Sequence, residues 1–195
     1  MKRLDDDLAA MLAHDIRGPL TSIAGFAELL EEGYLEGAEA TDAARTIRLN
    51  AQRLAELASD MVVLSRLRTG EKIATEPVDL TDLLRSAIEG LETKREIAAD
   101  LAAEHAQISG DADLLRSAIG HLLASAVRFT PSGEPVRIEL RADGDSYRFA
   151  VHSVAGKGIA LLVATTILQR HGGRIELDAA PDRVGPFTVL LPAAE

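Results

Sequence analysis

The stretch LAHDIRGPLT at residues 12–21 places a histidine, an acid and a proline within two turns of an expected helix. Proline in a helix interior removes a backbone donor and clashes with the carbonyl four residues earlier, at a cost of about 3 kcal/mol. Gly18 adds about 1 kcal/mol relative to alanine. The helix could therefore end at Arg17. Apolar residues resume at helical spacing after Pro19, however, so we favour one helix over about residues 5–32 that bends just after His14.

A second amphipathic pattern follows Gly33 and Gly37, which mark the end of the first helix and a loop. It begins near Thr41 and runs to about Arg68, where Gly70 marks its end. Two such helices with a short loop between them are predicted to form an antiparallel hairpin. Each apolar stripe is broader than one helix can cover, so we favour a homodimer that forms a four-helix bundle. In the alternative, the hairpin packs on the rest of its own chain.

After a connector at residues 71–78, the pattern changes to short helices and alternating strands. Helices are expected over residues 81–88, 111–126 and 159–170, and strands over 136–140, 147–152, 174–177 and 187–191, with one or two more between 97 and 108. This order predicts an α+β sandwich domain, with helices on one face of a mixed, mostly antiparallel sheet. The expected domains are a helical hairpin at 1–70, a linker at 71–78 and the α+β domain at 79–195.

Composition limits the function that such a chain can have. The net charge of −10 argues against nucleic acid or an anionic membrane as the main partner. No apolar run reaches the roughly 20 residues that a membrane-spanning helix needs, and three acids at residues 5–7 stand where a signal peptide would have its apolar core. We therefore expect a cytoplasmic protein with no membrane insertion. There are no cysteines, and the five histidines show no helical pairing, so no metal site is expected.

The sequence AHDIRGPL at residues 13–20 resembles the H-box of two-component sensor histidine kinases, which has the form His-Glu/Asp-x-x-Thr/Asn-Pro-Leu. The likeness covers essentially the whole chain, because the hairpin resembles the dimerisation and histidine-phosphotransfer domain and the α+β part resembles the ATP-binding domain. It implies that His14 accepts a phosphoryl group on a ring nitrogen, which requires a neutral imidazole. Asp15 is then expected to hold the other ring nitrogen and favour the nucleophilic tautomer.

The resemblance also implies a partner. The phosphorylated histidine passes its phosphoryl group to an aspartate on a response-regulator receiver domain, which docks against the bundle at the H-box, here beside Arg17, Gly18 and Pro19. Family members that also dephosphorylate their partner carry Thr or Asn at the position of Gly18, where the side chain orients the attacking water. Glycine has no such side chain, so the resemblance predicts weak phosphatase activity.

The α+β domain departs from the family at its nucleotide-binding motifs. His121 and Ser125 stand where the N-box has two asparagines, the second of which coordinates magnesium in the family. Neither residue replaces that hard oxygen ligand well. The helix is otherwise the same, and Arg128 and Phe129 keep the expected cationic and aromatic types.

The glycine boxes differ as well. No Asp or Glu lies between Asp145 and Glu176, so the carboxylate that reads adenine in the family is absent. The family's lid is missing, because the glycines of residues 156–158 follow the preceding strand almost directly, and Ala160 replaces the last glycine of the second box. The segment GKG at 156–158 is a weak phosphate-binding motif, and a tight strand-to-helix turn explains it better.

These features together predict a histidine phosphotransferase of the histidine-kinase superfamily, which carries phosphate on His14, exchanges it with receiver aspartates and has lost ATP and magnesium as cofactors. Two alternatives stay open. One is a pseudokinase adaptor that binds a cognate histidine kinase or a response regulator without chemistry. The other is a sensor histidine kinase core with an atypical but active ATP site.

Overall fold

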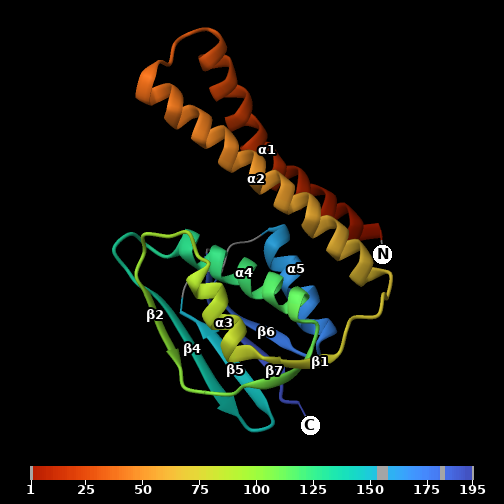
Figure 1. Cartoon of the computed structure of the whole chain (residues 1–195). Coiled ribbons are helices and arrows are strands. Elements are labelled where there is room, and N and C mark those ends of the chain that lie inside the picture. The colour runs from red at the N-terminus through yellow and green to blue at the C-terminus, as the bar shows by residue number, and fades with distance from the viewer. Residues whose placement is uncertain (1, 153–157, 181–182, 195) are drawn as a thin grey trace. The chain divides into compact units, whose positions relative to one another are not determined.

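The computed structural model describes residues 2–152, 158–180 and 183–194, and the chain divides into two compact units between Ser65 and Arg66. The first unit contains helix α1 (Lys2–Glu31) and most of helix α2 (Gly37–Arg68), which lie side by side as a hairpin (Figure 1). The predicted helical hairpin is therefore confirmed.

Helix α1 continues through Gly18 and Pro19, so the single-helix prediction is confirmed and a helix that ends at Arg17 is excluded. The predicted bend after His14 stays a prediction. The start of α2 near Thr41 was wrong, since the helix begins at Gly37. The Thr41 hydroxyl donates to the Gly37 carbonyl oxygen at 3.0 Å, which places this threonine one turn inside the helix and not at its cap.

A polar contact joins the two helices of the hairpin in the half of α1 that follows Pro19. The Asn50 side-chain amide of α2 donates to the Ser22 hydroxyl oxygen of α1 at 3.2 Å and to the Thr46 carbonyl oxygen at 2.9 Å. Because Ser22 and Asn50 are both half-buried, this contact fixes the register between the two helices beside the H-box.

The second unit is the expected α+β domain. Its helices are α3 (Leu80–Glu89), α4 (Ala112–Phe129) and α5 (Ile159–Arg170). Its main sheet has the order β2-β4-β5-β7-β6, formed by β2 (Ile97–Leu101), β4 (Val136–Asp143), β5 (Ser146–Val151), β6 (Arg174–Ala180) and β7 (Arg183–Pro192). Only β2 and β4 pair in parallel. Figure 1 shows the three helices on one face of this sheet, which confirms the predicted architecture.

A separate two-stranded sheet pairs β1 (Glu76–Asp79) with β3 (Gln107–Gly110) in antiparallel orientation. The sequence indicated no strand at residues 76–79. The reason lies in the pairing, because Val78 and Ile108 are opposite each other and both are buried, so the strand forms only when its distant partner is present.

The core of the second unit lies between the main sheet and its helices. Phe149 of β5 and Phe187 of β7 are almost completely buried and pack edge to face, with ring centroids 6.3 Å apart. The predicted alternation along β4 is confirmed, because Val136, Ile138 and Leu140 are buried while Arg137 is exposed. The other buried hydrophobic side chains described are aliphatic, in a chain whose aromatic content is only 3%.

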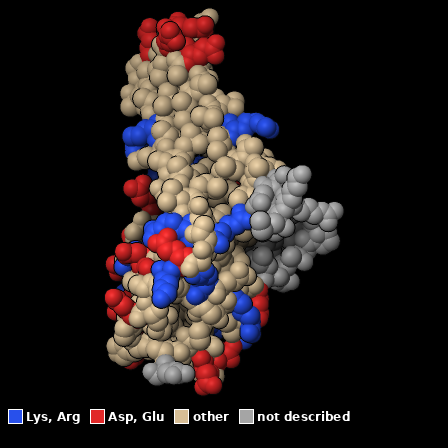
Figure 2. Space-filling model, turned by 90° about the vertical axis from the view of Figure 1, so that its right-hand side faces the viewer, with Lys and Arg blue, Asp and Glu red and all other residues tan. Residues whose placement is uncertain are grey.

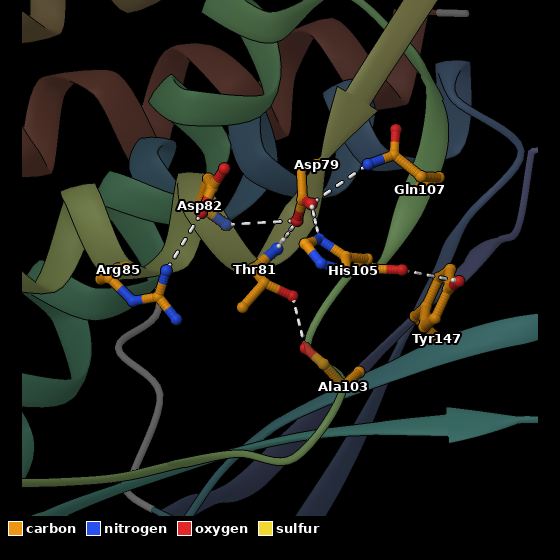
Figure 3. Close-up of polar contacts among 8 residues, drawn as sticks. All are labelled: Asp79, Thr81, Asp82, Arg85, Ala103, His105, Gln107 and Tyr147. Carbon is orange, nitrogen blue, oxygen red and sulfur yellow. Dashed lines mark hydrogen bonds and ion pairs between the residues drawn. The ribbon is translucent and has the colours of Figure 1, made fainter.

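The N-terminus of α3 is held by a polar cluster around Asp79 (Figure 3). One carboxylate oxygen accepts the backbone N–H groups of Thr81 and Asp82 at 2.9 and 3.3 Å, which makes Asp79 the N-cap. The other accepts the Gln107 amide at 3.1 Å and lies 3.4 Å from His105 Nδ1. Burial alone would raise the pKa of Asp79, but the hydrogen bonds from Asp82, Thr81 and His105 together lower it.

The C-terminus of α5 is fixed by His171, the C-cap of the helix. Its Nδ1–H donates to the Ile167 carbonyl at 2.7 Å, and its Nε2 accepts the Asp111 backbone N–H at 3.0 Å. Both ring nitrogens are therefore used by the neutral imidazole. The ring packs so closely on Gly110 that an added Cβ there would lie 2.4 Å from Cδ2. This contact joins the end of α5 to the start of α4.

Candidate functional site: the H-box of helix α1

The structure places the predicted phospho-acceptor on an open surface of the hairpin. His14, Arg17 and Gly18 are all exposed. Since residues three and four apart share one face of a helix, these three form a single patch on α1. An imidazole in this position can be reached by a docking protein without any rearrangement of the helix.

Asp15 and Pro19 occupy the neighbouring face of the same two turns. They are four residues apart, and Asp15 is half-buried while Pro19 is buried. Pro19 therefore belongs to the packed side of the helix, beside the predicted docking surface and not on it. The helix geometry brings the H-box residues together in two rows, one exposed and one turned inward.

Open space surrounds Gly18. A Cβ added there would meet no atom within 4 Å, and the same holds for Gly25 two turns further on. Gly18 and Gly25 therefore leave two positions without side-chain bulk on the exposed surface of α1. A surface of this kind allows the backbone of a partner to approach the helix closely.

Charge is distributed unevenly along the hairpin. Acidic side chains gather at its loop end, which is the top of Figure 2. There is no Lys or Arg between Arg17 and Arg45. The exposed acids of this segment are Glu28, Glu31, Glu32, Glu36, Glu39 and Asp42. A partner that docks along α1 toward the loop meets a negative potential.

The second unit contains the residues that correspond to the family's nucleotide-binding motifs. His121 and Ser125 lie one turn apart on α4, and both are half-buried. Arg128 and Phe129 follow at the exposed end of that helix, with the guanidinium carbon 5.4 Å from the ring centroid. The Thr130 hydroxyl donates to the Ala126 carbonyl at 2.7 Å, so Thr130 ends the helix and has a structural role.

Strand β5 ends at Val151, where the family has its adenine-binding carboxylate. The next residue is His152, whose Nε2 lies 3.2 Å from the Glu139 carboxylate on the adjacent strand. Helix α5 begins at Ile159, so only residues 152–158 connect strand and helix. Residues 153–157, which include Gly156 and Lys157 of the weak phosphate motif, lie outside the described residues, and that motif stays a prediction.

Among the described residues, no group of three or more His, Cys, Asp and Glu side chains could hold a metal ion. None of the helices described is long and apolar enough to cross a membrane.

Sequence reasoning missed the contacts made by Arg170 and by the Asp79 cluster. Arg170 bonds to backbone carbonyls about a hundred positions earlier in the chain, and Asp79 is approached by Gln107 of β3 and by His105 just before that strand. The sequence predicted the end of α5 at residue 170, but it contained no signal for the long-range partners of Arg170 or Asp79.

The family model that matches this chain is the His Kinase A (phospho-acceptor) domain, over residues 5–70. The chain is 27% identical to the sensor protein DivL of Caulobacter vibrioides, a match that covers all of the chain and 29% of the relative. It is 29% identical to the signal transduction histidine-protein kinase/phosphatase MprB of Mycobacterium leprae, over 92% of the chain and 41% of that protein. The chain thus spans about half or less of the length of the curated relatives that it matches.

Solved structures share the fold. The histidine kinase AdeS of Acinetobacter baumannii aligns with a TM-score of 0.72 and 16% identity, over 93% of this chain and 98% of that one. The histidine kinase ThkA, solved in complex with the response regulator protein TrrA, aligns with a TM-score of 0.68 and 19% identity, over 99% of this chain and 64% of that one. The sequence match and the shared fold show that this chain is similar, along its whole length, to the core of a two-component sensor histidine kinase.

Proposed function

We propose that this protein carries phosphate on His14 and exchanges it with the aspartate of response-regulator receiver domains, without drawing phosphate from ATP. The observation that supports this most strongly is the exposed His14 in an H-box on a continuous helix, within a chain whose second unit has His121 and Ser125 at the N-box positions. The histidine kinase ThkA shares this fold and was solved in complex with a response regulator protein, which supports a response regulator as the partner.

The transfer follows from the chemistry of the two groups. The lone pair of one His14 ring nitrogen attacks the phosphorus of the receiver's aspartyl phosphate, a nitrogen–phosphorus bond forms, and the phosphorus–oxygen bond to the carboxylate breaks. The carboxylate leaves with the electron pair. The other ring nitrogen carries the imidazole proton during the transfer, and a carboxylate such as that of Asp15 can stabilise it there. The reverse reaction delivers the phosphoryl group to a second receiver.

The first experiment measures transfer from phosphorylated receivers. The purified protein is incubated with a panel of receivers that carry labelled aspartyl phosphate, and label on the protein is measured with time. We expect label from at least one receiver, loss of that label in His14→Gln, and full label in His152→Gln, which changes another exposed histidine. If no receiver labels the protein in a His14-dependent way, phosphotransfer is ruled out.

The same variants separate the two alternatives. A pseudokinase adaptor keeps its cellular effect when His14 is replaced by Gln, whereas a phosphotransferase loses it. If the protein were an active autokinase, the purified protein would transfer label from ATP to His14 in the presence of magnesium. The phosphotransfer proposal predicts no such label.

We also propose that two hairpins associate into a four-helix bundle. Among the described residues of the hairpin, five large apolar side chains are exposed in the single chain, namely Leu20, Leu29, Tyr34, Leu49 and Val62. A second copy is the partner that covers such helical surface most simply. Sedimentation should show a dimer that Val62→Asp dissociates, while Phe129→Asp, at an exposed aromatic of the second unit, leaves it intact. A monomeric wild-type protein would contradict the bundle.

A further inference from the structure

The end of helix α2 is built as a closed turn. Gly70 has φ of +80°, and its N–H donates to the Leu67 carbonyl at 3.3 Å. The Glu71 N–H donates to the Arg66 carbonyl, also at 3.3 Å. This pair of bonds around a left-handed glycine is the Schellman arrangement, which ends a helix and reverses the chain.

Arg170, the last residue of α5, reaches across this turn. One guanidinium nitrogen, Nη1, donates to the Leu67 carbonyl at 3.0 Å, and Nη2 donates to the Glu71 carbonyl at 2.5 Å. All three residues belong to the second unit, which begins at Arg66. A planar guanidinium can bridge two carbonyl oxygens in this way, whereas a lysine ammonium offers a single point of attachment.

The helix that carries Arg170 is itself rigidly held. The next residue, His171, bonds both to Ile167 within α5 and to Asp111 at the start of α4. Ile167 and Leu168 are buried in the core. The guanidinium therefore projects from a fixed part of the second unit, and the α2 turn that it holds has little freedom to move against that unit.

We propose that Arg170 is a strap that makes the last turn of α2 a part of the second unit, so that this turn and the connector after it move together with that unit. The segment at residues 71–78 would otherwise be the expected joint. Two structural features support the proposal. The division between the two compact units falls before Arg66, so the end of α2 already belongs to the second unit. The connector ends in strand β1, which is paired with β3 of the same unit.

Hydrogen exchange of the full chain tests the strap. Arg170→Ala should raise exchange at the Gly70 and Glu71 amides by about tenfold, the factor expected for loss of a hydrogen bond from a charged donor. Arg170→Lys should give an intermediate rise because it keeps the charge but not the fork. The matched control is Arg174→Ala, which removes an exposed arginine paired with Glu176 and should leave these amides unchanged. Equal exchange in the Arg170 and Arg174 variants would overturn the proposal.

A distance measurement tests the position of the joint separately. The chain has no cysteine, so the double variant Arg68→Cys and Asp145→Cys can be spin-labelled cleanly. With Arg170 present we expect one narrow distance distribution, because both labels lie in one rigid unit, and a clearly broader one after Arg170→Ala. Far-UV circular dichroism identifies any variant that has simply unfolded. A distribution that is already broad with Arg170 present would place the joint after Arg68 and contradict the strap.

Discussion

In helix α1, a Cβ added to Gly18 would meet no atom within 4 Å, whereas one added to Gly110 in the second unit would lie 2.4 Å from the His171 ring. The same contrast holds for apolar side chains. Of the six large apolar residues exposed among those that the structure describes, five lie in the hairpin and only Phe129 lies in the second unit. Among the described residues, the hairpin leaves large apolar side chains uncovered, while the second unit buries most of its own.

In the proposed function, this difference separates the residue that carries phosphate from the residues that support the fold. The hairpin carries the exposed His14, the proposed acceptor, and the second unit uses its polar residues on its own backbone, as Asp79 does at α3 and His171 at α4. The first prediction below alters the second unit and measures whether the hairpin responds, and the next three test contacts within one unit.

The largest effect is expected from Phe149→Ala. Removal of this buried ring and of its edge-to-face contact with Phe187 should lower the free energy of unfolding of the second unit by about 3–5 kcal/mol. Because the hairpin is a separate compact unit, His14 should still accept phosphate from a receiver below the new melting temperature. Calorimetry and the labelling assay measure the two effects, and Phe129→Ala is the exposed control. Loss of labelling while the hairpin stays helical would show that the units are not independent.

A smaller loss is expected from Gly110→Ala. The new methyl group would collide with His171 and with Leu115 Cδ1, 2.9 Å away, so overpacking should cost about 1–3 kcal/mol. Gly120→Ala is the matched control on α4, where no atom lies within 4 Å of the added Cβ and the change should stabilise the helix by up to about 1 kcal/mol. Chemical denaturation measures both. Equal stability of the two variants would refute the close contact.

Next comes the pH dependence of the Asp79 cap. Its folded pKa lies below the unfolded value of 3.8, so its stabilisation is present above that value and is lost as pH falls through the lower folded pKa. Asp79→Ala should cost about 1 kcal/mol at neutral pH and reduce the loss of stability below pH 4. Denaturation midpoints from pH 7 to pH 2.5 measure this, with the exposed Asp145→Ala as the control. If the midpoints of Asp79→Ala fall with pH in parallel with those of the wild type, the carboxylate of Asp79 does not cause this pH dependence.

The smallest effects are expected at Gly18. Gly18→Ala should stabilise α1 by up to about 1 kcal/mol and leave phosphate acceptance by His14 unchanged, because the added methyl group meets only solvent. Gly18→Thr should raise the rate at which a phosphorylated receiver loses phosphate to water, if the remaining geometry for that reaction is present. Release of phosphate from the receiver is measured with and without the His14→Gln substitution, which distinguishes hydrolysis by water from transfer to His14. A wild-type protein that already releases phosphate rapidly would contradict the prediction.

Much of the fold could be predicted because its signals are local. The apolar period through Pro19 and the alternation along β4 each depend on neighbouring residues, and each was confirmed. The strand at Val78 and the contacts of Arg170 depend on partners about thirty and about one hundred residues away, and no local pattern encodes them. The start of α2 was wrong for a related reason, since a threonine hydroxyl can serve a cap or bond back within a helix.

The H-box could be recognised because its residues are adjacent in sequence. The division into an exposed row with His14 and a buried Pro19 needed the structure. The absence of a carboxylate between Asp145 and Glu176 was also a property of the sequence alone. The roles of His14, Asp15, Arg17 and Gly18 in transfer stay predictions.

The most direct test compares two phosphate donors on one preparation of the protein. Label on His14 is measured after incubation with labelled ATP and magnesium, and in parallel with labelled phospho-receivers, with His14→Gln as the blank for both. The account predicts label from a receiver and none above the blank from ATP. Label from ATP at His14 above the His14→Gln blank would contradict the claim that the second unit does not supply phosphate.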